Sequence, residues 1–315
     1  MTEPLVKARG LGRRFDEVIA VNDISLEIEP GETLALVGES GSGKTTLGRM
    51  LGLLLPPSEG SLEIGGNNVI GLRRRALKPL RRNVQMIFQD PVSSLNPRHT
   101  IASILTEPLR NFSEGSARDR LDRAIELLDA VGMPADTLRR YPHEFSGGQR
   151  QRITIARALA LNPRFVIADE PVSALDVSVQ SQILNLLADL KDRFELAYLF
   201  VSHDLAVVHY IADRVAVMYL GNIVELAPKQ ALFATPGHPY TQALLQTVPE
   251  VRPGKRRLGR LLSGEPPSPA SPPSGCHFHP RCFRATKRCH VEPPALYNHG
   301  DGQHLIACHH AGTES

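Results

Sequence analysis

The stretch GESGSGKT, residues 38–45, decides the fold, because it satisfies the phosphate-loop pattern G-x-x-x-x-G-K-[ST]. It follows an apolar run at residues 33–37 that predicts a strand, and residues 44–55 predict a helix that a Pro-Pro pair ends. Glycines let successive backbone N–H groups face a phosphate at the helix N-terminus, where the helix dipole favours negative charge. We therefore expect Lys44 to reach the β- and γ-phosphates of a nucleotide and the Thr45 hydroxyl to bind Mg²⁺. The residues expected to bind the nucleotide here are Gly38, Glu39, Ser40, Gly41, Ser42, Gly43, Lys44, Thr45 and Thr46.

The composition is that of a folded, soluble chain. The 315 residues include 36 Lys and Arg against 33 Asp and Glu, which gives a net charge of +3, and 42% are hydrophobic. This excludes a disordered chain and allows about two domains with a sizeable core. No run of about 18 uncharged apolar residues predicts a membrane span. The N-terminus MTEPLVKARG predicts no secretory signal, so we expect a cytosolic chain. The small net charge argues against nucleic acid as the main partner.

Apolar runs and helical patterns alternate along much of the chain. Strands are predicted at residues 84–88, 165–168 and 197–201, and helices at residues 179–190 and 205–212. Strands that alternate with helices predict an α/β fold with a mostly parallel sheet covered on both faces.

Two segments depart from this alternation. Between Arg98 and Leu161 the pattern is helical only, which predicts a helical subdomain, about residues 91–163, inserted into the α/β core. Residues 249–315 contain a proline-rich linker and then a short tail with all four cysteines and seven of the 12 histidines. We therefore divide the chain into a domain at residues 1–248 and a linker with a Cys/His-rich extension beyond it.

A second apolar strand ends in two carboxylates, in the sequence FVIADE, residues 165–170. In a parallel sheet of this type, the end of that strand lies beside the phosphate loop. Asp169 suits Mg²⁺ bound through water, because Mg²⁺ prefers oxygen ligands and keeps several waters. Glu170 suits a base, or an orienting group, for an attacking water.

The sequence SGGQ, residues 146–149, precedes a predicted helix and offers a second phosphate-binding surface. One chain rarely needs two such surfaces for one triphosphate. We therefore expect a dimer in which each phosphate loop faces the other chain's Ser146, Gly147, Gly148 and Gln149. Phosphate-loop kinases also carry such a loop, but that class of protein does not explain the presence of SGGQ.

Together and in this order, these motifs resemble those of ABC transporter ATPases. The matching parts are the Walker A loop at residues 38–45, the Q-loop at Gln89, the signature at 146–149, Walker B at 165–170, the D-loop at 173–176 and the switch histidine at His203. The resemblance implies a RecA-like P-loop core with an antiparallel β subdomain and an inserted helical subdomain.

The resemblance also implies a role for each residue. ATP lies between two subunits, Glu170 polarises the attacking water and His203 contacts the γ-phosphate. Gln89 binds Mg²⁺ and connects it to the membrane-facing surface. Asp176 belongs to the D-loop, and Phe15 stacks on the adenine.

Three longer stretches narrow the resemblance. FQDPVSSLNPR at residues 88–98, RYPHEFSGGQRQR at 140–152 and HPYTQALLQTVP at 238–249 look like the ATPase subunits of dipeptide and oligopeptide ABC importers, most of all the second ATPase of the pair. This implies a heterodimer with a second homologous ATPase, two permease subunits and, indirectly, a substrate-binding protein. It places the chain on the cytoplasmic face of the inner or plasma membrane, as a peripheral protein. Related importers also carry nickel chelates or glutathione, and the other function class is an ABC ATPase without a permease that acts on DNA or ribosomes.

The tail has the cysteine spacing C-x5-C-x6-C-x18-C. In a cytosolic chain disulfides are disfavoured, so the thiols are expected to hold an iron–sulfur cluster or Zn²⁺, or to stay reduced. Pairs of the form C-x₂₋₄-C, usual for zinc, are missing. The resemblance implies a [4Fe–4S] cluster, which would stabilise a segment too small for its own core. The predicted ligands are Cys276, Cys282, Cys289 and Cys308.

Overall fold

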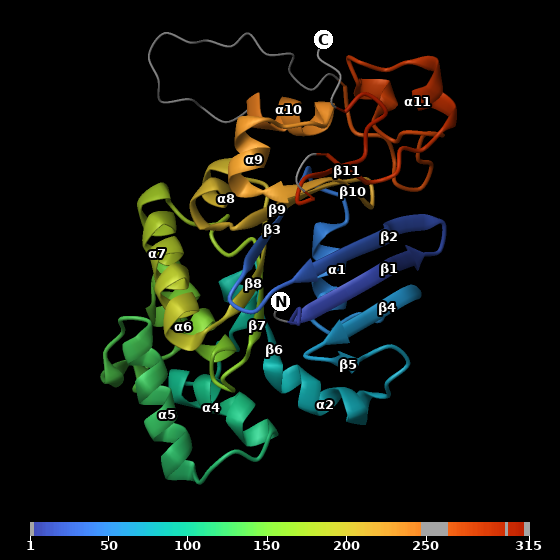
Figure 1. Cartoon of the computed structure of the whole chain (residues 1–315). Helices are drawn as coiled ribbons and strands as arrows, with labels where there is room; N and C mark the ends of the chain where they lie inside the picture. The colour runs from blue at the N-terminus through green and yellow to red at the C-terminus, as the bar shows by residue number, and fades with distance from the viewer. Residues whose placement is uncertain (1–2, 247–263, 300–301, 312–315) are drawn as a thin grey trace.

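The computed structural model of the chain describes residues 3–246, 264–299 and 302–311, which form two sheets with helices packed on them (Figure 1). The larger sheet has eight strands in the order β11 (Tyr297–Asn298), β12 (Leu305–Ile306), β10 (Asn222–Pro228), β9 (Arg214–Tyr219), β3 (Thr33–Val37), β8 (Ala197–Ser202), β7 (Phe165–Asp169) and β6 (Val84–Ile87). The smaller, antiparallel sheet has the order β2 (Val18–Ile28), β1 (Val6–Phe15), β4 (Glu59–Ile64) and β5 (Asn67–Asn68).

The helices that lie between β6 and β7 along the chain, α3 to α6, form a helical lobe. The described helices are α1 (Lys44–Leu51), α2 (Arg74–Asn83), α3 (Pro91–Ser94), α4 (Ile101–Asn111), α5 (Ala117–Ala130), α6 (Gly147–Ala158), α7 (Val177–Phe194), α8 (Leu205–Ile211), α9 (Lys229–Ala234), α10 (Pro239–Gln246) and α11 (Lys287–Val291), with short 3₁₀ helices η1 (Ala135–Arg139), η2 (Pro142–Glu144) and η3 (His279–Arg281). Helices α4 and α5 lie at the far end of the lobe in Figure 1. Within the described ranges, no helix combines the length and apolar character needed to cross a membrane.

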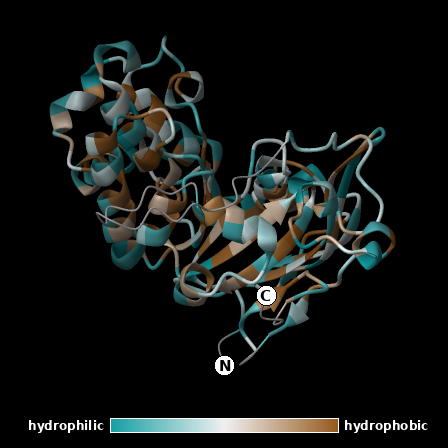
Figure 2. Ribbon diagram, turned by 90° about the horizontal axis from the view of Figure 1, so that it is seen from above, coloured by the Kyte–Doolittle hydropathy of each residue, from teal (hydrophilic) through white to brown (hydrophobic). Residues whose placement is uncertain are grey.

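The predicted α/β core is confirmed. Strands β9, β3, β8, β7 and β6 run parallel to one another, and both faces of this sheet are covered. Along β7, Phe165 and Ile167 pack with α1 and the smaller sheet, whereas Val166 and Ala168 pack with α6 and α7. Hydrophobic residues accordingly follow the strands of the sheet in Figure 2. The predicted helical subdomain, between β6 and β7, is confirmed as well.

One predicted helix is shorter than expected. The sequence predicts a helix to residue 55, but α1 ends at Leu51. The next residues turn the chain, because Leu53 takes a left-handed φ of +57° and its carbonyl accepts a hydrogen bond of 2.8 Å from Arg81 Nη2. The N–H groups of Leu54 and Leu53 donate to the carbonyl oxygens of Arg49 (2.9 Å) and Met50 (3.1 Å), a Schellman motif that ends the helix before the Pro-Pro pair is reached.

The C-terminal segment joins the main sheet, which the sequence did not predict. Strand β12 pairs with β10 in antiparallel register, with Glu225 opposite Ile306 and Leu226 opposite Leu305. An edge strand with unpaired backbone groups is thereby covered. The predicted linker at residues 265–275 contains neither helix nor strand, and the predicted boundary between residues 248 and 249 lies outside the described residues.

A buried carboxylate holds this junction. Glu225 is fully buried and accepts hydrogen bonds from the backbone N–H groups of Gly237 (2.8 Å) and His238 (2.9 Å), and it lies 2.7 Å from His304 Nε2. Burial alone raises the pKa of a carboxyl group, but these hydrogen bonds outweigh burial and hold the pKa of Glu225 below its ordinary value. The charged form is therefore stabilised where β10, the segment before α10 and β12 meet.

Phe278 anchors the segment in the core. Its side chain is 2% exposed, and its ring lies 5.3 Å from the rings of both Tyr219 and Tyr240.

We expect Phe278→Ala to lower the free energy of unfolding by about 3–5 kcal/mol, because it removes a large buried ring and leaves a cavity. Urea unfolding of the full chain measures this loss. Phe283→Ala is the matched control: this residue is 39% exposed, so a smaller loss of about 1 kcal/mol is expected. Equal losses in the two variants would contradict the anchor.

Candidate functional site

The phosphate loop, residues 38–45, curls between β3 and α1 and is pressed against both sheets. Gly43 has a φ of +103°, and a Cβ there would lie 2.1 Å from the carbonyl oxygen of Ala20 in β2. A Cβ at Gly38 would lie 2.2 Å from the carbonyl oxygen of Met218 in β9. Only glycine fits at these two positions, so the loop takes its shape from strands on either side of it.

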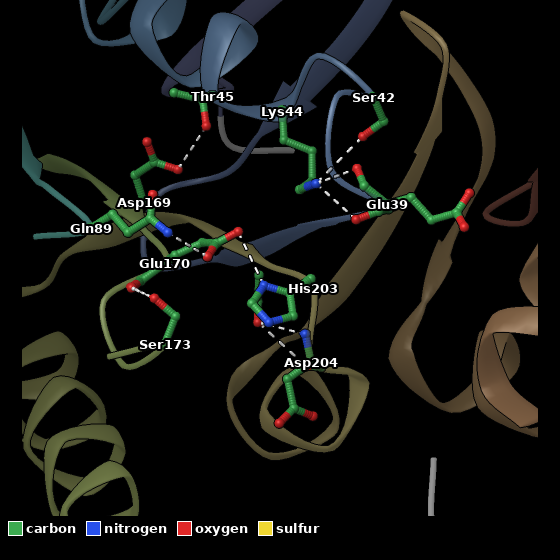
Figure 3. Close-up of polar contacts among 12 residues, drawn as sticks. Glu39, Ser42, Lys44, Thr45, Gln89, Asp169, Glu170, Ser173, His203 and Asp204 are labelled. Atoms are coloured by element: carbon green, nitrogen blue, oxygen red, sulfur yellow. Dashed lines mark hydrogen bonds and ion pairs between the residues drawn. The ribbon is translucent and has the colours of Figure 1, made fainter. Parts of the chain in front are cut away.

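Lys44 lies at the centre of the loop. Its Nζ donates hydrogen bonds to the carbonyl oxygens of Gly38 (2.7 Å) and Glu39 (2.8 Å) and lies 3.4 Å from Ser42 Oγ (Figure 3). Burial lowers the pKa of the Lys44 ammonium, although nearby carboxylates, Glu170 most strongly, act in the opposite direction. A buried cation at a helix N-terminus is suited to bind a polyanion.

Asp169 and Thr45 bring two oxygen groups together at the end of β7. Thr45 Oγ1 donates to Asp169 Oδ1 over 3.3 Å, and the Asp169 residue is only 4% exposed. Burial raises the pKa of Asp169, while the Thr45 hydrogen bond lowers it less. A hydroxyl and a buried carboxylate are oxygen ligands of the kind that Mg²⁺ prefers, so these residues fit the predicted Mg²⁺ site.

The Glu170 carboxylate is held from two sides. Gln89 Nε2 donates to Glu170 Oε2 over 3.0 Å, and His203 Nδ1 lies 3.1 Å from Glu170 Oε1 (Figure 3). The three residues follow the neighbouring parallel strands β6, β7 and β8. Gln89, Glu170 and His203 are therefore brought together at the carboxyl edge of the sheet, beside the phosphate loop.

The backbone of Glu170 is itself constrained. Its φ is +47°, a left-handed conformation that is uncommon for a residue with a side chain and that clusters at functional sites. Its N–H donates to the Val201 carbonyl oxygen (3.0 Å), and its own carbonyl accepts from Ser173 Oγ (3.1 Å). These bonds to β8 and to the following loop aim the carboxylate at Gln89 and His203.

The SGGQ segment forms the start of α6. Ser146 Oγ accepts a hydrogen bond from the Gln149 N–H (3.3 Å), and Gln149 Oε1 accepts one from the Ser146 N–H (3.0 Å), which is a capping box. Ser146, Gly147 and Gln149 are exposed and Gly148 is half-buried. No hydrogen bond or ion pair among the described residues joins this segment to the phosphate loop. Helices α1 and α6 pack on opposite faces of the sheet.

Two predicted residues lie apart from this cluster. Phe15 ends β1 with its ring 40% exposed, and the Arg13 guanidinium lies 4.6 Å from the ring centroid. Asp176 precedes α7, is exposed, and makes no side-chain hydrogen bond to cap that helix. An exposed aromatic ring and an exposed carboxylate are both available to a ligand or a second subunit.

Two residues that sequence reasoning missed also contact the phosphate loop. Tyr240 Oη accepts a hydrogen bond from the Glu39 N–H (2.8 Å), and Arg281 forms a two-point ion pair with the Glu39 carboxylate. They lie 201 and 242 residues from Glu39 along the chain. No local pattern signals contacts over such separations.

The four cysteines of the tail are free thiols in the described part of the chain. Backbone N–H groups of Arg284 and His310 each donate to a cysteine Sγ over 3.4 Å. The pKa of Cys276 is raised to about 11, mainly because the thiol is buried and to a smaller extent because other cysteines lie near it. Within the described ranges, no group of three or more His, Cys, Asp or Glu side chains is placed to hold a single metal ion. The metal at these four residues therefore stays a prediction.

Comparisons with known proteins agree with this geometry. The model of the ABC transporter family matches residues 21–173, and that of the oligopeptide/dipeptide transporter C-terminal region matches residues 224–289. A probable peptide ABC transporter ATP-binding protein of Sinorhizobium fredii is 56% identical over 292 residues, which are 93% of this chain and 82% of the relative. The dipeptide transport ATP-binding protein DppF of Haemophilus influenzae is 49% identical over 302 residues, 96% of this chain and 92% of the relative.

Among solved structures, the ATP-binding cassette MJ0796, determined as a dimer bound to ADP and Pi, matches with a TM-score of 0.65 and 30% identity. The match covers 71% of this chain and 98% of that cassette. CbiO1 of Clostridium perfringens, part of the cbiONQ transporter complex, matches with a TM-score of 0.68 and 25% identity over 74% of this chain and 92% of that one. The chain therefore belongs to the ABC transporter ATP-binding proteins, and it carries the C-terminal region of their oligopeptide and dipeptide members.

Proposed function

We propose that this chain hydrolyses ATP to ADP and phosphate to drive a membrane permease that imports peptides. The observation that carries the proposal is the Glu170 carboxylate, held by Gln89 and His203 next to the Lys44 loop. A carboxylate in that place acts on an attacking water, because the loop presents the γ-phosphate beside it.

Binding of ATP rests on this chain's own phosphate loop and Phe15. The ring of Phe15 stacks on adenine, the loop N–H groups face the phosphates, and Lys44 exchanges its contacts with loop carbonyls for the β- and γ-phosphates. Thr45 and Gln89 would supply oxygen ligands to Mg²⁺, and Asp169 would hold it through water. When bound, Mg²⁺ neutralises negative charge that develops on the phosphates.

Hydrolysis then depends on how Glu170 and His203 are oriented. The Gln89 amide and the His203 ring each contact a different oxygen of Glu170, so the carboxylate keeps one orientation toward the water. Glu170 polarises the water and His203 contacts the γ-phosphate, while the bond from the water oxygen to the γ-phosphorus forms and the bond to the oxygen of the departing ADP breaks. Because Gln89 also belongs to the loop before α3, a shift of that loop changes the contact with Glu170.

Each complete site needs a second subunit. The exposed Ser146–Gln149 segment is the facing surface for another chain's ATP, and Asp176 lies in the loop expected at that interface. The dimer of MJ0796 supports such an arrangement. The partner is a second homologous ATPase, which makes a heterodimer.

The transport assignment rests on the C-terminal region and the relatives. Proteins named as peptide and dipeptide transport ATP-binding proteins match over more than nine-tenths of this chain. We infer that two permease subunits bind the heterodimer and that a substrate-binding protein delivers the peptide to them, while the ATPase remains peripheral at the cytoplasmic face of the membrane. Nickel chelates or glutathione are the alternative cargoes.

We further propose that the four tail cysteines bind a [4Fe–4S] cluster. Hydrogen bonds from backbone N–H groups to Cys282 and Cys308 support thiolate ligands. Zn²⁺ is the alternative metal for these four residues. The cluster would serve a structural purpose in the tail.

Glu170→Gln is expected to keep ATP binding, to lower hydrolysis about a hundredfold or more, and to trap an ATP-bound dimer, because the amide no longer accepts a proton from water. Phosphate release and size-exclusion chromatography with ATP measure the two effects in the chain combined with its partner ATPase. Glu126→Gln, an exposed change on α5, is the control and should hydrolyse normally. Unchanged hydrolysis in Glu170→Gln would show that the base assignment is wrong.

The transport assignment predicts recovery with two permease subunits when the tagged chain is purified from detergent-solubilised membranes. A chain that acts without a permease would instead be recovered with ribosomes or DNA. That result would replace peptide import by the other function class.

The cysteine assignment predicts a brown protein after anaerobic purification, with about four iron and four sulfide per chain. The same assay on Cys276→Ser should show a loss of both. A colourless protein that contains zinc would reject the cluster.

A further inference from the structure

The Arg281–Glu39 ion pair joins the cysteine-bearing tail to the phosphate loop. Arg281 Nη1 lies 2.6 Å from Glu39 Oε2, and Arg281 Nη2 lies 3.1 Å from Glu39 Oε1. The Arg281 side chain is 5% exposed and that of Glu39 26%. A two-point, largely desolvated pair of this geometry is stronger and more directional than a surface ion pair.

The remaining polar groups of Glu39 are also held. Its N–H donates to Tyr240 Oη (2.8 Å), and its carbonyl accepts from Lys44 Nζ (2.8 Å). Figure 3 shows the Glu39 side chain pointing away from Lys44 while its carbonyl faces that residue. Backbone and side chain of Glu39 are thus oriented from α10 and from η3, both near the C-terminus.

Arg281 is itself held in place by packing. It is the last residue of η3, between Cys276 and Cys282. Phe278 lies directly before this 3₁₀ helix and is buried against Tyr219 and Tyr240. The guanidinium is therefore presented to the loop by a rigid part of the tail.

The Arg281–Glu39 ion pair changes the charge that a bound nucleotide meets at the phosphate loop. The phosphate loop must accept a polyanion, yet Glu39 adds a negative charge to it. Arg281 neutralises that charge and turns it away from Lys44, where the phosphates are expected. Without Arg281, an unpaired carboxylate at the loop repels the phosphates and is free to approach Lys44.

We propose that Arg281 is a positioning residue for ATP, which acts through Glu39 and thereby couples the cysteine-bearing tail to the phosphate loop. The proposal rests on the proposed ATP site at residues 38–45. It does not require that the cysteines hold a metal.

The test compares four full-length proteins: wild type, Arg281→Ala, Glu39→Gln and the double variant. Titration with a fluorescent ATP analogue in the presence of Mg²⁺ gives the affinity, and steady-state hydrolysis gives KM and kcat. Arg281→Ala is expected to weaken binding roughly tenfold and to raise KM, with kcat at saturation unchanged. Glu39→Gln removes the repelling charge, so the double variant should bind within about threefold of Glu39→Gln alone.

Rescue by Glu39→Gln separates positioning from general damage to the tail. If Arg281→Ala weakens binding equally in both backgrounds, or does not weaken it at all, the proposal is wrong. Arg281→Lys keeps the charge but not the two-point contact, and it should lie between wild type and Arg281→Ala. It also decides the question if Arg281→Ala fails to fold, because a wild-type affinity in Arg281→Lys would overturn the role of the two-point contact.

Two controls isolate the cause. Arg288→Ala removes the exposed Arg288–Glu292 pair of the same tail (2.6 Å) and should leave ATP affinity unchanged. Lys44→Ala should abolish binding whatever stands at residue 281. Retained binding in Lys44→Ala would reject the ATP site itself, whereas loss there with no effect of Arg281→Ala would reject only the coupling.

Coupling is reciprocal, so ATP must also stabilise the tail. Amide hydrogen exchange of residues 276–291 is expected to slow at least threefold when ATP and Mg²⁺ bind to the wild type. The same comparison in Arg281→Ala should show no slowing. Equal slowing in both proteins, or in neither, would contradict transmission through this pair.

Discussion

The structure depends on one steric constraint: the phosphate loop must expose its N–H groups while its backbone touches strands of both sheets. Gly43 lies against the Ala20 carbonyl in β2, and Gly38 lies against the Met218 carbonyl in β9. The turn after β9 adds a hydrogen bond from the Gly221 N–H to the Ser42 carbonyl oxygen (2.9 Å). The loop can therefore keep its shape only when the small antiparallel sheet and the parallel sheet are both in place. The nucleotide site therefore forms only where the two sheets meet.

The chemistry follows from the parallel strands around that junction. Because β6, β7 and β8 run in the same direction, the residues after their ends meet at one edge of the sheet. Burial shifts the pKa values of two charged groups there in opposite directions, because it raises the pKa of Asp169 and lowers the pKa of Lys44. A bound cation favours the charged carboxylate, and bound phosphates favour the charged amine. A bound metal–nucleotide pair would thus offset the free-energy cost of burying both charges.

The C-terminal segment is small but is built into the same core. It extends the sheet through β12, places Phe278 among aromatic rings and brings His304 against the buried Glu225 carboxylate of β10. A segment of this size gains stability by sharing the hydrophobic core of a larger domain. Sharing the core also brings Arg281 to the phosphate loop, so stability and contact with the site have one structural origin.

The sequence by itself determined the parts whose cause is local. The alternation of apolar strands and helices predicted the α/β core, and the helix-only pattern between Arg98 and Leu161 predicted the helical subdomain. The phosphate-loop pattern and the motifs that follow it predicted the ATP-binding family. The roles of the individual site residues remain predictions, although Gln89, Glu170 and His203 do meet. Tertiary structure alone decided the pairing of β12 with β10. It alone also decided the Arg281–Glu39 pair, because contacts between residues so distant in sequence depend on how the sheets pack and leave no periodic or spacing pattern in the chain.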